Sequence, residues 1–501
     1  MKQKTENIPG TFSKGILAFG FWVIAFMLSA PCPSSAQQME IGTNFWARVD
    51  WTGELPFKNG VNFSSAWNSG IGDDHLVNEN VWNEAFLEEI EFYTVLRFMD
   101  WVPTNKSPIQ FWHQRRLPTD QGQTATFNED LGIAYEWMVD LCNRTDADMW
   151  ICLPHKAVDD YHINLAELIH GQLKPGLKVY VEYSNEVWNF QEQGGYADQQ
   201  GAALGLTRQQ YVAHRSAELW GNFQTVFGEE FENRVVKTIC GQATNSWIGH
   251  EQLTYLYSSD NPNGLHPDVF GIAPYFGGNG LNANVSNVWQ LLHTDIFDHR
   301  WDNPSKDSRM DGVIKNYEKV KAIDESINLI AYEGGQHIQT NADMVNYDPE
   351  MYGLYIEYLE ALDDYLTVFA HYVNAGECSS QNCWGSKRFT GQPMADAPKY
   401  RALYDYAQSS TGFLDFKREI PGIRAFPNPC REELALDVPA AETGGLVVYN
   451  PFGQQVLTTA VNSLTDPLTL DTGALPPGLY YVQLRMQDGT LRRSSFVKGS
   501  L

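Results

Sequence analysis

The chain alternates short apolar runs with longer amphipathic stretches from about residue 38 to residue 415. Helical periodicity marks the longer stretches, for example residues 129–145, 207–228 and 351–365. The short runs are rich in β-branched and aromatic residues. We expect eight of them to be strands, at residues 40–46, 92–99, 147–154, 177–184, 234–240, 268–274, 327–332 and 365–373. Strands that alternate with helices are typical of βα units and a parallel sheet.

Eight such units fit a (β/α)8 TIM barrel, a fold of about 200 to more than 400 residues. An open, doubly wound sheet is the alternative α/β architecture. Neither a GxGxxG motif nor a P-loop follows the first expected strand, which disfavours the nucleotide-binding forms of the open sheet. The sequence therefore predicts a barrel.

Proline-punctuated segments with short alternating runs replace this pattern after about residue 420. Their Gly and Pro turns predict a small β-sandwich. We therefore expect three regions: a signal peptide at residues 1–36, the barrel at 37–418 and the C-terminal β-sandwich at 419–501.

The first 36 residues have the order of a secretory signal. Three lysines precede an apolar run at residues 15–28, and small residues then lead to Ala36, after which we expect cleavage. The run is shorter than the roughly 20 residues of a spanning helix, so no stable membrane insertion is expected. Lipid attachment at Cys32 is the weaker alternative, because Pro31 before it fits a lipobox poorly.

The formal net charge is −26, from 61 acidic and 35 basic residues. This balance disfavours nucleic acid as a partner, because phosphate binding needs clustered Lys and Arg. In an exported chain disulfides are permitted, and Cys378 and Cys383 are close enough in sequence either to pair or to remain free. The apolar surroundings of Cys142, Cys152 and Cys240 indicate plain buried thiols.

Two carboxylates follow expected strands at the points where those strands end. Glu186 lies in "EYSNEVWN" after the fourth strand, and Glu333 lies in "LIAYEGGQH" after the seventh. In a (β/α)8 barrel these ends form the active face. A retaining glycosidase needs such a pair, one carboxyl as nucleophile and one as acid/base, about 5–5.5 Å apart. The alternative is that both are ordinary exposed acids.

The Asn185-Glu186 pair and Glu333 give the chain a resemblance to the clan A glycoside hydrolases, which are (β/α)8 enzymes. The resemblance implies that Glu186 is the acid/base, that Asn185 binds the sugar 2-hydroxyl and that Glu333 is the nucleophile. It also implies that Arg97, ending the second strand, keeps the nucleophile ionised, since a nearby cation lowers a carboxylate pKa. The alternative for Arg97 is a surface pair with Asp100.

Four further positions match the clan's pattern. His155 ends the third strand and Tyr275 the sixth, where the resemblance implies a substrate-contacting His and a Tyr bonded to the nucleophile. Trp384, after the eighth strand, and Trp188 are the candidate sugar-stacking platforms. The alternative for His155 and Tyr275 is that they are hydrogen-bonded core residues.

A metal site is the rival interpretation of "LPHKAVDDYH", in which His155, Asp159, Asp160 and His162 could be ligands. Loop residues this close seldom hold one ion without distant partners. Glycoside cleavage needs no metal, so neither a metal nor another cofactor is expected.

The C-terminal segment resembles the sorting domain that directs Bacteroidetes proteins through the type IX secretion system. The matching pieces are Pro427-Asn428-Pro429, the Gly453 turn, the step at residues 478–480 and a basic end of Arg492, Arg493 and Lys498. The alternative is an accessory β-sandwich that binds carbohydrate.

Together these features predict a secreted or cell-surface retaining glycoside hydrolase acting on a β-linked polysaccharide or oligosaccharide. The type IX machinery is the second expected partner. A catalytically silent carbohydrate-binding or adhesive protein on the same fold is the alternative, although two facing carboxylates serve no purpose in a protein that only binds.

Overall fold

The structure is a computed structural model. It describes residues 38–45, 82–99, 101–120, 123, 132–278, 280–381, 383–409, 424–426, 430–437, 444–450, 455–461, 468–486 and 491–499. The predicted signal peptide and its cleavage site lie outside these residues, as does Asp100.

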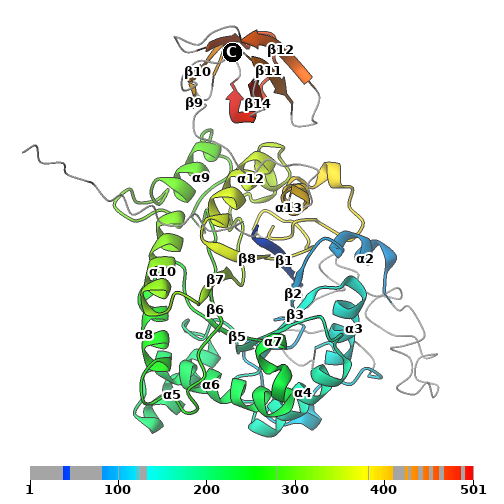
Figure 1. Ribbon diagram of the computed structural model, residues 1–501, viewed down its shortest axis with the longest axis vertical. Helices are drawn as coiled ribbons and strands as arrows, with labels where there is room; N and C mark the ends of the chain where they lie inside the picture. Colours follow the sequence, from blue (N-terminus) through cyan, green and yellow to red (C-terminus); the bar gives the residue numbers. More distant parts are fainter. Residues whose placement is uncertain are drawn as a thin grey trace, which may run out of the picture. The chain divides into compact units, whose positions relative to one another are not determined.

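Eight parallel strands close into a barrel in sequence order, β1 to β8, with β8 pairing back to β1 (Figure 1). Each strand lies within one of the eight predicted runs: β1 Glu40–Asn44, β2 Val95–Arg97, β3 Asp148–Leu153, β4 Val179–Tyr183, β5 Val235–Cys240, β6 Val269–Ile272, β7 Asn328–Ala331 and β8 Leu366–His371. The predicted TIM barrel is confirmed, and the open doubly wound sheet is wrong.

Helices surround the strands (Figure 1). They are α2 Glu84–Ile90, α3 Tyr135–Thr145, α4 Asp159–Gln172, α5 Glu192–Leu204, α6 Arg208–Phe227, α7 Phe231–Arg234, α8 Ser246–Leu256, α9 Val288–Phe297, α10 Arg309–Ile323, α11 Asp343–Asn346, α12 Glu350–Asp363 and α13 Pro398–Ser409. Short 3-10 turns lie at Trp112–Gln114, Gly228–Glu230 and Met394–Asp396. Helix α6 shows how the local sequence sets the bounds of a helix. At its start the Thr207 hydroxyl accepts a hydrogen bond from the backbone N–H of Gln210, and at its end Gly228 adopts a φ of 52°.

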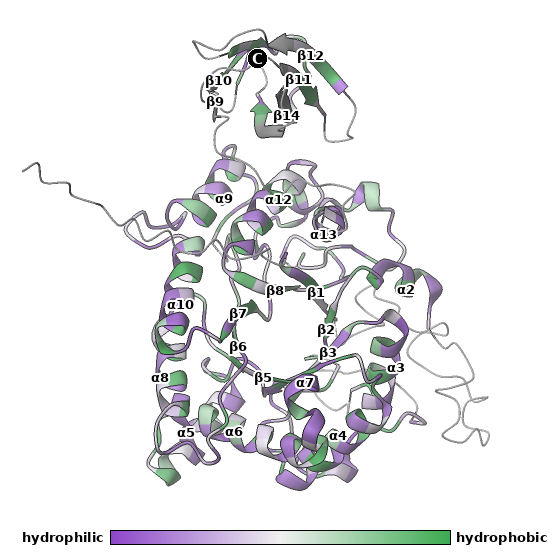
Figure 2. Cartoon of the chain, viewed as in Figure 1, coloured by the Kyte–Doolittle hydropathy of each residue, from purple (hydrophilic) through white to green (hydrophobic). Residues whose placement is uncertain are grey.

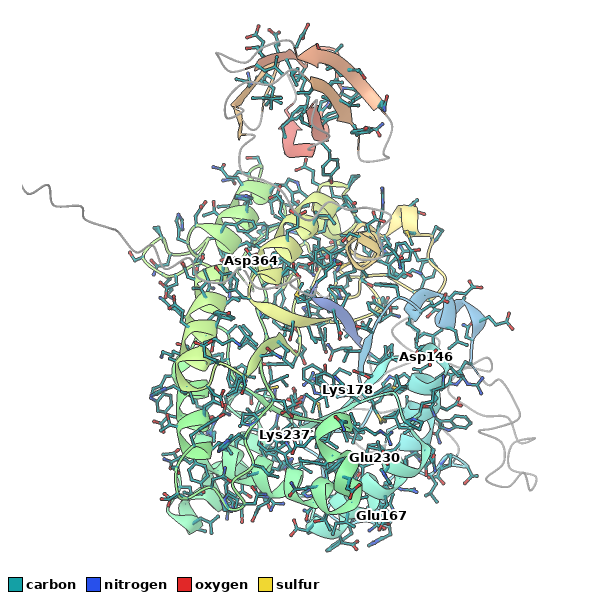
Figure 3. The ribbon with its side chains drawn as sticks, viewed as in Figure 1. Asp146, Glu167, Lys178, Glu230, Lys237 and Asp364 are labelled. Carbon is teal, nitrogen blue, oxygen red and sulfur yellow. A yellow bond between two sulfur atoms is a disulfide. The ribbon has the colours of Figure 1, made fainter. Side chains whose placement is uncertain are left out.

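The barrel has an inner and an outer apolar layer. Along β4, Val179 and Val181 belong to the large cluster between strands and helices, whereas Tyr180 belongs to the small cluster inside the barrel. This alternation follows from the two-residue period of a strand. Hydrophobic and hydrophilic residues also alternate along the outer helices (Figure 2), and charged side chains such as Asp146, Glu167 and Glu230 are exposed at the surface (Figure 3). None of the described helices is both long and apolar enough to cross a bilayer.

The C-terminal region consists of two antiparallel sheets, as predicted. One has the order β13-β10-β9 and the other β12-β11-β14-β15. The strands are β9 Arg424–Phe426, β10 Glu433–Asp437, β11 Gly444–Tyr449, β12 Gln455–Val461, β13 Leu468–Asp471, β14 Gly478–Met486 and β15 Leu491–Lys498. Both sheets contribute to one small core, for example through Leu434, Val448 and Phe496. The Pro427-Asn428-Pro429 motif and Gly453 lie outside the described residues.

Candidate active site

The end of β4 carries Asn185 and Glu186 on a sharp turn. Ser184 and Glu186 both adopt left-handed backbone conformations, with φ of 59° and 45°. Such conformations cost non-glycine residues of the order of 1 kcal/mol or more and are concentrated at functional sites. The turn therefore departs from strand geometry at the point where the polar pair begins, and it leaves Glu186 partly exposed while Asn185 is buried.

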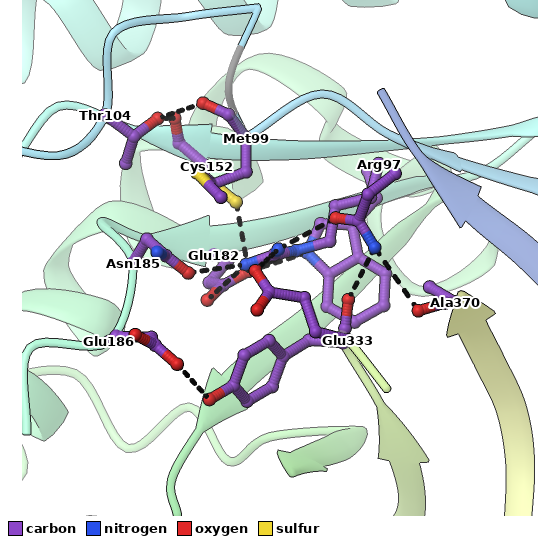
Figure 4. Close-up of polar contacts among 12 residues, drawn as sticks. Arg97, Met99, Thr104, Cys152, Glu182, Asn185, Glu186, Glu333 and Ala370 are labelled. Carbon is purple, nitrogen blue, oxygen red and sulfur yellow. Dashed lines mark hydrogen bonds and ion pairs between the residues drawn. The ribbon is translucent and has the colours of Figure 1, made fainter. Parts of the chain in front are cut away.

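Arg97, at the end of β2, is the centre of the polar network (Figure 4). Its Nη1 donates to Glu333 Oε1 at 2.9 Å and to Asn44 Oδ1 at 3.0 Å. Its Nη2 donates to Asn185 Oδ1 at 2.9 Å and to Glu182 Oε2 at 3.0 Å, and its Nε donates to Glu182 Oε2 at 3.2 Å. Arg97 is 0% exposed, so the alternative of a surface arginine is wrong.

Glu182, inside β4, is a buried carboxylate that the sequence interpretation did not identify. Besides Arg97, it accepts hydrogen bonds from the Trp150 indole at 2.9 Å and from the Cys152 thiol at 3.1 Å. Cys152 is therefore buried as expected, but beside a charged network rather than in apolar surroundings. The available signal was a single Glu within an otherwise apolar strand, because a buried carboxylate requires a partner.

Glu333 follows β7 and is 5% exposed. Its Oε1 accepts from Arg97, and its Oε2 accepts from the Tyr275 hydroxyl at 2.9 Å. Burial raises the pKa of Glu333, whereas Arg97 and the Tyr275 hydrogen bond oppose that rise. Burial and the charge of Glu333 raise the pKa of Tyr275, so its hydroxyl keeps its proton and remains a donor.

The groups around Glu186 stabilise a negative charge less than those around Glu333. Its Oε1 accepts from the Tyr332 hydroxyl at 3.2 Å, and its Oε2 accepts from Asn189 Nδ2 at 3.2 Å. Burial, followed by the charge of Glu333, raises the pKa of Glu186 to about 8. No cation binds it directly among the described residues, whereas Glu333 has the Arg97 guanidinium. When the pair carries one proton, these contacts favour the proton on Glu186 and the negative charge on Glu333.

The two candidate tryptophans lie in different surroundings. Trp188 lines a pocket together with Glu186 and Gln252. Trp384 donates from its indole to His337 Nδ1 at 3.3 Å, and the His337 ring lies 5.3 Å from that of Tyr275. Trp384 is thus connected through one side chain, His337, to the tyrosine that bonds Glu333.

The loop that carries Trp384 is held from three sides. A disulfide joins Cys378 to Cys383, which settles the alternative that the sequence left open. The Cys383 carbonyl accepts from Gln336 Nε2 at 2.7 Å and from Lys399 Nζ at 2.8 Å. Lys399 is fully buried and also donates to the Trp384 carbonyl at 3.3 Å. These contacts fix the backbone beside the tryptophan.

His155 is 2% exposed and follows β3. Burial lowers its pKa to about 4, so the imidazole is neutral at pH 7. Its ring lies 5.1 Å from that of Tyr196, and among the described residues no hydrogen bond or ring contact joins it to either catalytic candidate. No three His, Cys, Asp or Glu side chains in the described part of the chain converge as a metal centre would require, so the ligand set around His162 is not assembled.

The structure thus joins Arg97, Asn185, Tyr275 and Glu333 directly and reaches Glu186 through another tyrosine. Sequence reasoning missed several residues of this network, namely Asn44, Glu182, Asn189, Tyr332 and His337.

Comparison with known families identifies the C-terminal region. Residues 424–498 match the family described as "Secretion system C-terminal sorting domain". The chain therefore carries a secretion sorting domain, which implies the type IX machinery as a partner. No curated protein matches the chain.

Several solved structures are similar to this chain at low sequence identity. The GH51 arabinofuranosidase from Xanthomonas axonopodis pv. citri is 9% identical, with 92% of this chain and 98% of that one covered and a TM-score of 0.45. A trimodular GH5_4 subfamily endoglucanase is 12% identical, with 92% and 79% covered and a TM-score of 0.39. A GH5 lichenase from Caldicellulosiruptor sp. F32 is 13% identical, with 74% and 93% covered and a TM-score of 0.39. The activities in these names belong to those proteins, and the function proposed for this chain rests on its own side chains.

Proposed function

We propose that this protein is a secreted retaining glycoside hydrolase that cleaves a β-linked polysaccharide or oligosaccharide. Glu333 is the nucleophile and Glu186 the acid/base. The observation that carries the proposal is the contrast between the two carboxylates, because Glu333 bonds a buried guanidinium while Glu186 bonds only neutral donors. Two carboxyl groups with pKa values pushed apart are what an acid and a nucleophile need at one pH.

In the first step, a carboxylate oxygen of Glu333 attacks the anomeric carbon while Glu186 gives its proton to the departing glycosidic oxygen. The product is a glycosyl ester of Glu333, which has lost its negative charge. The pKa of Glu186 then falls, because one cause of its elevation has gone. In the second step, Glu186 takes a proton from water, water attacks the anomeric carbon, and Glu333 leaves as a carboxylate.

The remaining residues bind and orient the sugar in this scheme. Asn185 Oδ1 accepts from Arg97, which fixes the amide; one hydrogen of Nδ2 donates to Asn105 Oδ1 at 3.3 Å, and the other is proposed to donate to the sugar 2-hydroxyl. Trp384 and Trp188 are the proposed stacking platforms, and the neutral His155 is proposed to contact substrate. Stacking of a sugar on an aromatic face adds apolar burial to these polar contacts.

The proposed cellular route follows from both ends of the chain. Cleavage after Ala36 would release the chain from the first export step, and the C-terminal sorting domain would pass it to the outer surface. The site would then meet polymers outside the cell.

The test is release of reducing sugar from a panel of β-glucans, mannans, xylans and galactans by the mature protein. Glu333→Gln and Glu186→Gln should each abolish or strongly reduce release, with a loss of about 10²–10⁴-fold for the acid/base. Glu229→Gln, at an exposed carboxylate, is the matched control and should retain full activity. Proton NMR of the first-formed product should show the retained anomer. An inverted anomer would contradict the mechanism, and binding without release would favour the silent binding protein.

A further inference from the structure

Tyr332 lies between the two catalytic candidates, Glu186 and Glu333, and is neither the proposed acid/base nor the proposed nucleophile. It directly precedes Glu333, is 0% exposed and packs with the cluster inside the barrel. Its hydroxyl donates to Glu186 Oε1 at 3.2 Å, and its ring lies 5.0 Å from the Arg97 guanidinium carbon. One side chain thus contacts both the acid and the cation that holds the nucleophile.

The position of this ring is fixed by its neighbours. The Tyr332 carbonyl accepts from Asn44 Nδ2 at 3.0 Å. On the adjacent strand β6, a Cβ at Gly271 would lie 2.5 Å from Cys240 Sγ and 3.3 Å from Tyr332 Cδ1, so the glycine leaves space for both the thiol and the ring. Because these contacts involve the backbone and the ring, a phenylalanine at position 332 would fit the same space and lose only the hydroxyl.

We propose that Tyr332 is a positioning residue for the acid/base, holding Glu186 in one orientation and stabilising its ionised form in the second half of the reaction. The inference rests on the proposed function and deepens it. A hydrogen bond to a carboxylate is stronger than one to a neutral acid, so the Tyr332 hydroxyl contributes most when Glu186 has given up its proton. That is the state in which Glu186 must accept a proton from water.

Several groups act on Glu186 and decide how it titrates. Glu333 raises its pKa, Arg97 lowers it, and the hydrogen bonds from Tyr332 and Asn189 also lower it. Glu182 and Cys240 line a pocket together with Glu186. Tyr332→Phe removes one lowering contribution and leaves the others, so the pKa of Glu186 should rise.

The experiment compares wild type with Tyr332→Phe. The falling alkaline limb of kcat/KM should move to higher pH in the variant, because Glu186 keeps its proton longer. With a 2,4-dinitrophenyl glycoside, whose leaving group needs no acid, the second step limits kcat and should slow by about 10-fold or more. Azide, a nucleophile that needs no general base, should restore much of that rate.

Tyr180→Phe is the matched control, because Tyr180 lies in the same cluster inside the barrel. This substitution should change neither the alkaline limb of the kcat/KM profile nor the response to azide. An unshifted limb, or a slow variant that azide does not rescue, would overturn the proposal. Titration of the Glu186 carboxyl by carbon-13 NMR, without substrate, measures its pKa independently of catalysis. A raised pKa in Tyr332→Phe would support the contact even if no polymer were cleaved, whereas failure of the proposed function would appear as an inactive wild type.

Discussion

The carboxylate of Glu182 lies 3.0 Å from Nη2 of Arg97, and both side chains are almost completely removed from solvent. Removing one partner of a buried ion pair costs about 3–5 kcal/mol where the other charge is left alone. Arg97 keeps Glu333 as a second carboxylate partner, so we expect Glu182→Gln to lower the free energy of unfolding by less than this, about 1–3 kcal/mol, through the hydrogen bonds that the Glu182 carboxylate accepts. Urea denaturation measures the change. Activity should fall too, because Arg97 also orients Asn185 and Glu333.

The matched control is Asp146→Asn, which breaks the exposed ion pair between Asp146 and Lys174. Exposed pairs are worth less than about 1 kcal/mol, so this variant should unfold at nearly the wild-type urea concentration. Equal destabilisation by the two substitutions would mean that the pair inside the barrel carries no special energy.

The charge of Glu333 should be visible in the titration of Glu186. In Glu333→Gln the like charge is gone while the burial of Glu186 remains, so its pKa should fall from about 8 but stay above the ordinary 4.5. Carbon-13 NMR of labelled glutamate carboxyls measures this directly. Glu229→Gln should leave the curve in place, and a Glu186 curve unchanged by Glu333→Gln would mean that the two carboxyls do not interact.

Activity should depend on pH through the same pair. In the proposed mechanism the productive state has Glu186 protonated and Glu333 ionised, so kcat/KM should rise with pH as Glu333 loses its proton and fall as pH passes through about 8, where Glu186 loses its own. The measurement is a pH–rate profile on any cleaved substrate. With a 2,4-dinitrophenyl glycoside, Glu186→Ala should lack the falling limb, and its persistence would assign that limb to another group.

The Cys378–Cys383 disulfide should affect substrate binding more than chemistry. Opening it frees the loop before Trp384, so ordering that side chain on binding should cost more. We expect the Cys378→Ser, Cys383→Ser double variant to raise KM about 3- to 10-fold with little change in kcat. Treating wild type with a reductant should have the same effect, and the double variant should not respond to it. A fall in kcat alone would place the loop's influence on the reaction steps.

The strands of the barrel were predictable because strands covered on both faces are continuous apolar runs in the sequence. Glu186 and Glu333 were recognisable for the same reason, since each interrupts such a run at its end. Asn185 and Arg97 followed from resemblance, and the structure adds the bonds that connect them.

Glu182 and Tyr332 were missed because their importance depends on distant partners. Glu182 bonds Arg97, 85 residues earlier, and the Tyr332 hydroxyl reaches a carboxylate 146 residues away. Glu182 is conspicuous as the one carboxylate of its strand, but the sequence does not say which cation it meets, and a tyrosine at a strand end differs little from an ordinary sheet residue. Periodicity reports which face a residue occupies and not which side chain it meets across the barrel.

Closure of the barrel also determines when the site comes into existence. Asn44 on β1 accepts from Arg97 and donates to the carbonyl of His371 at the end of β8, 327 residues later in the chain. Contacts of such long sequence separation carry a large loop-closure entropy, and chains that depend on them fold slowly. A full-length chain that is not yet folded therefore has every side chain of the proposed active site but not their arrangement. The proposed activity requires that the last strand has joined the first.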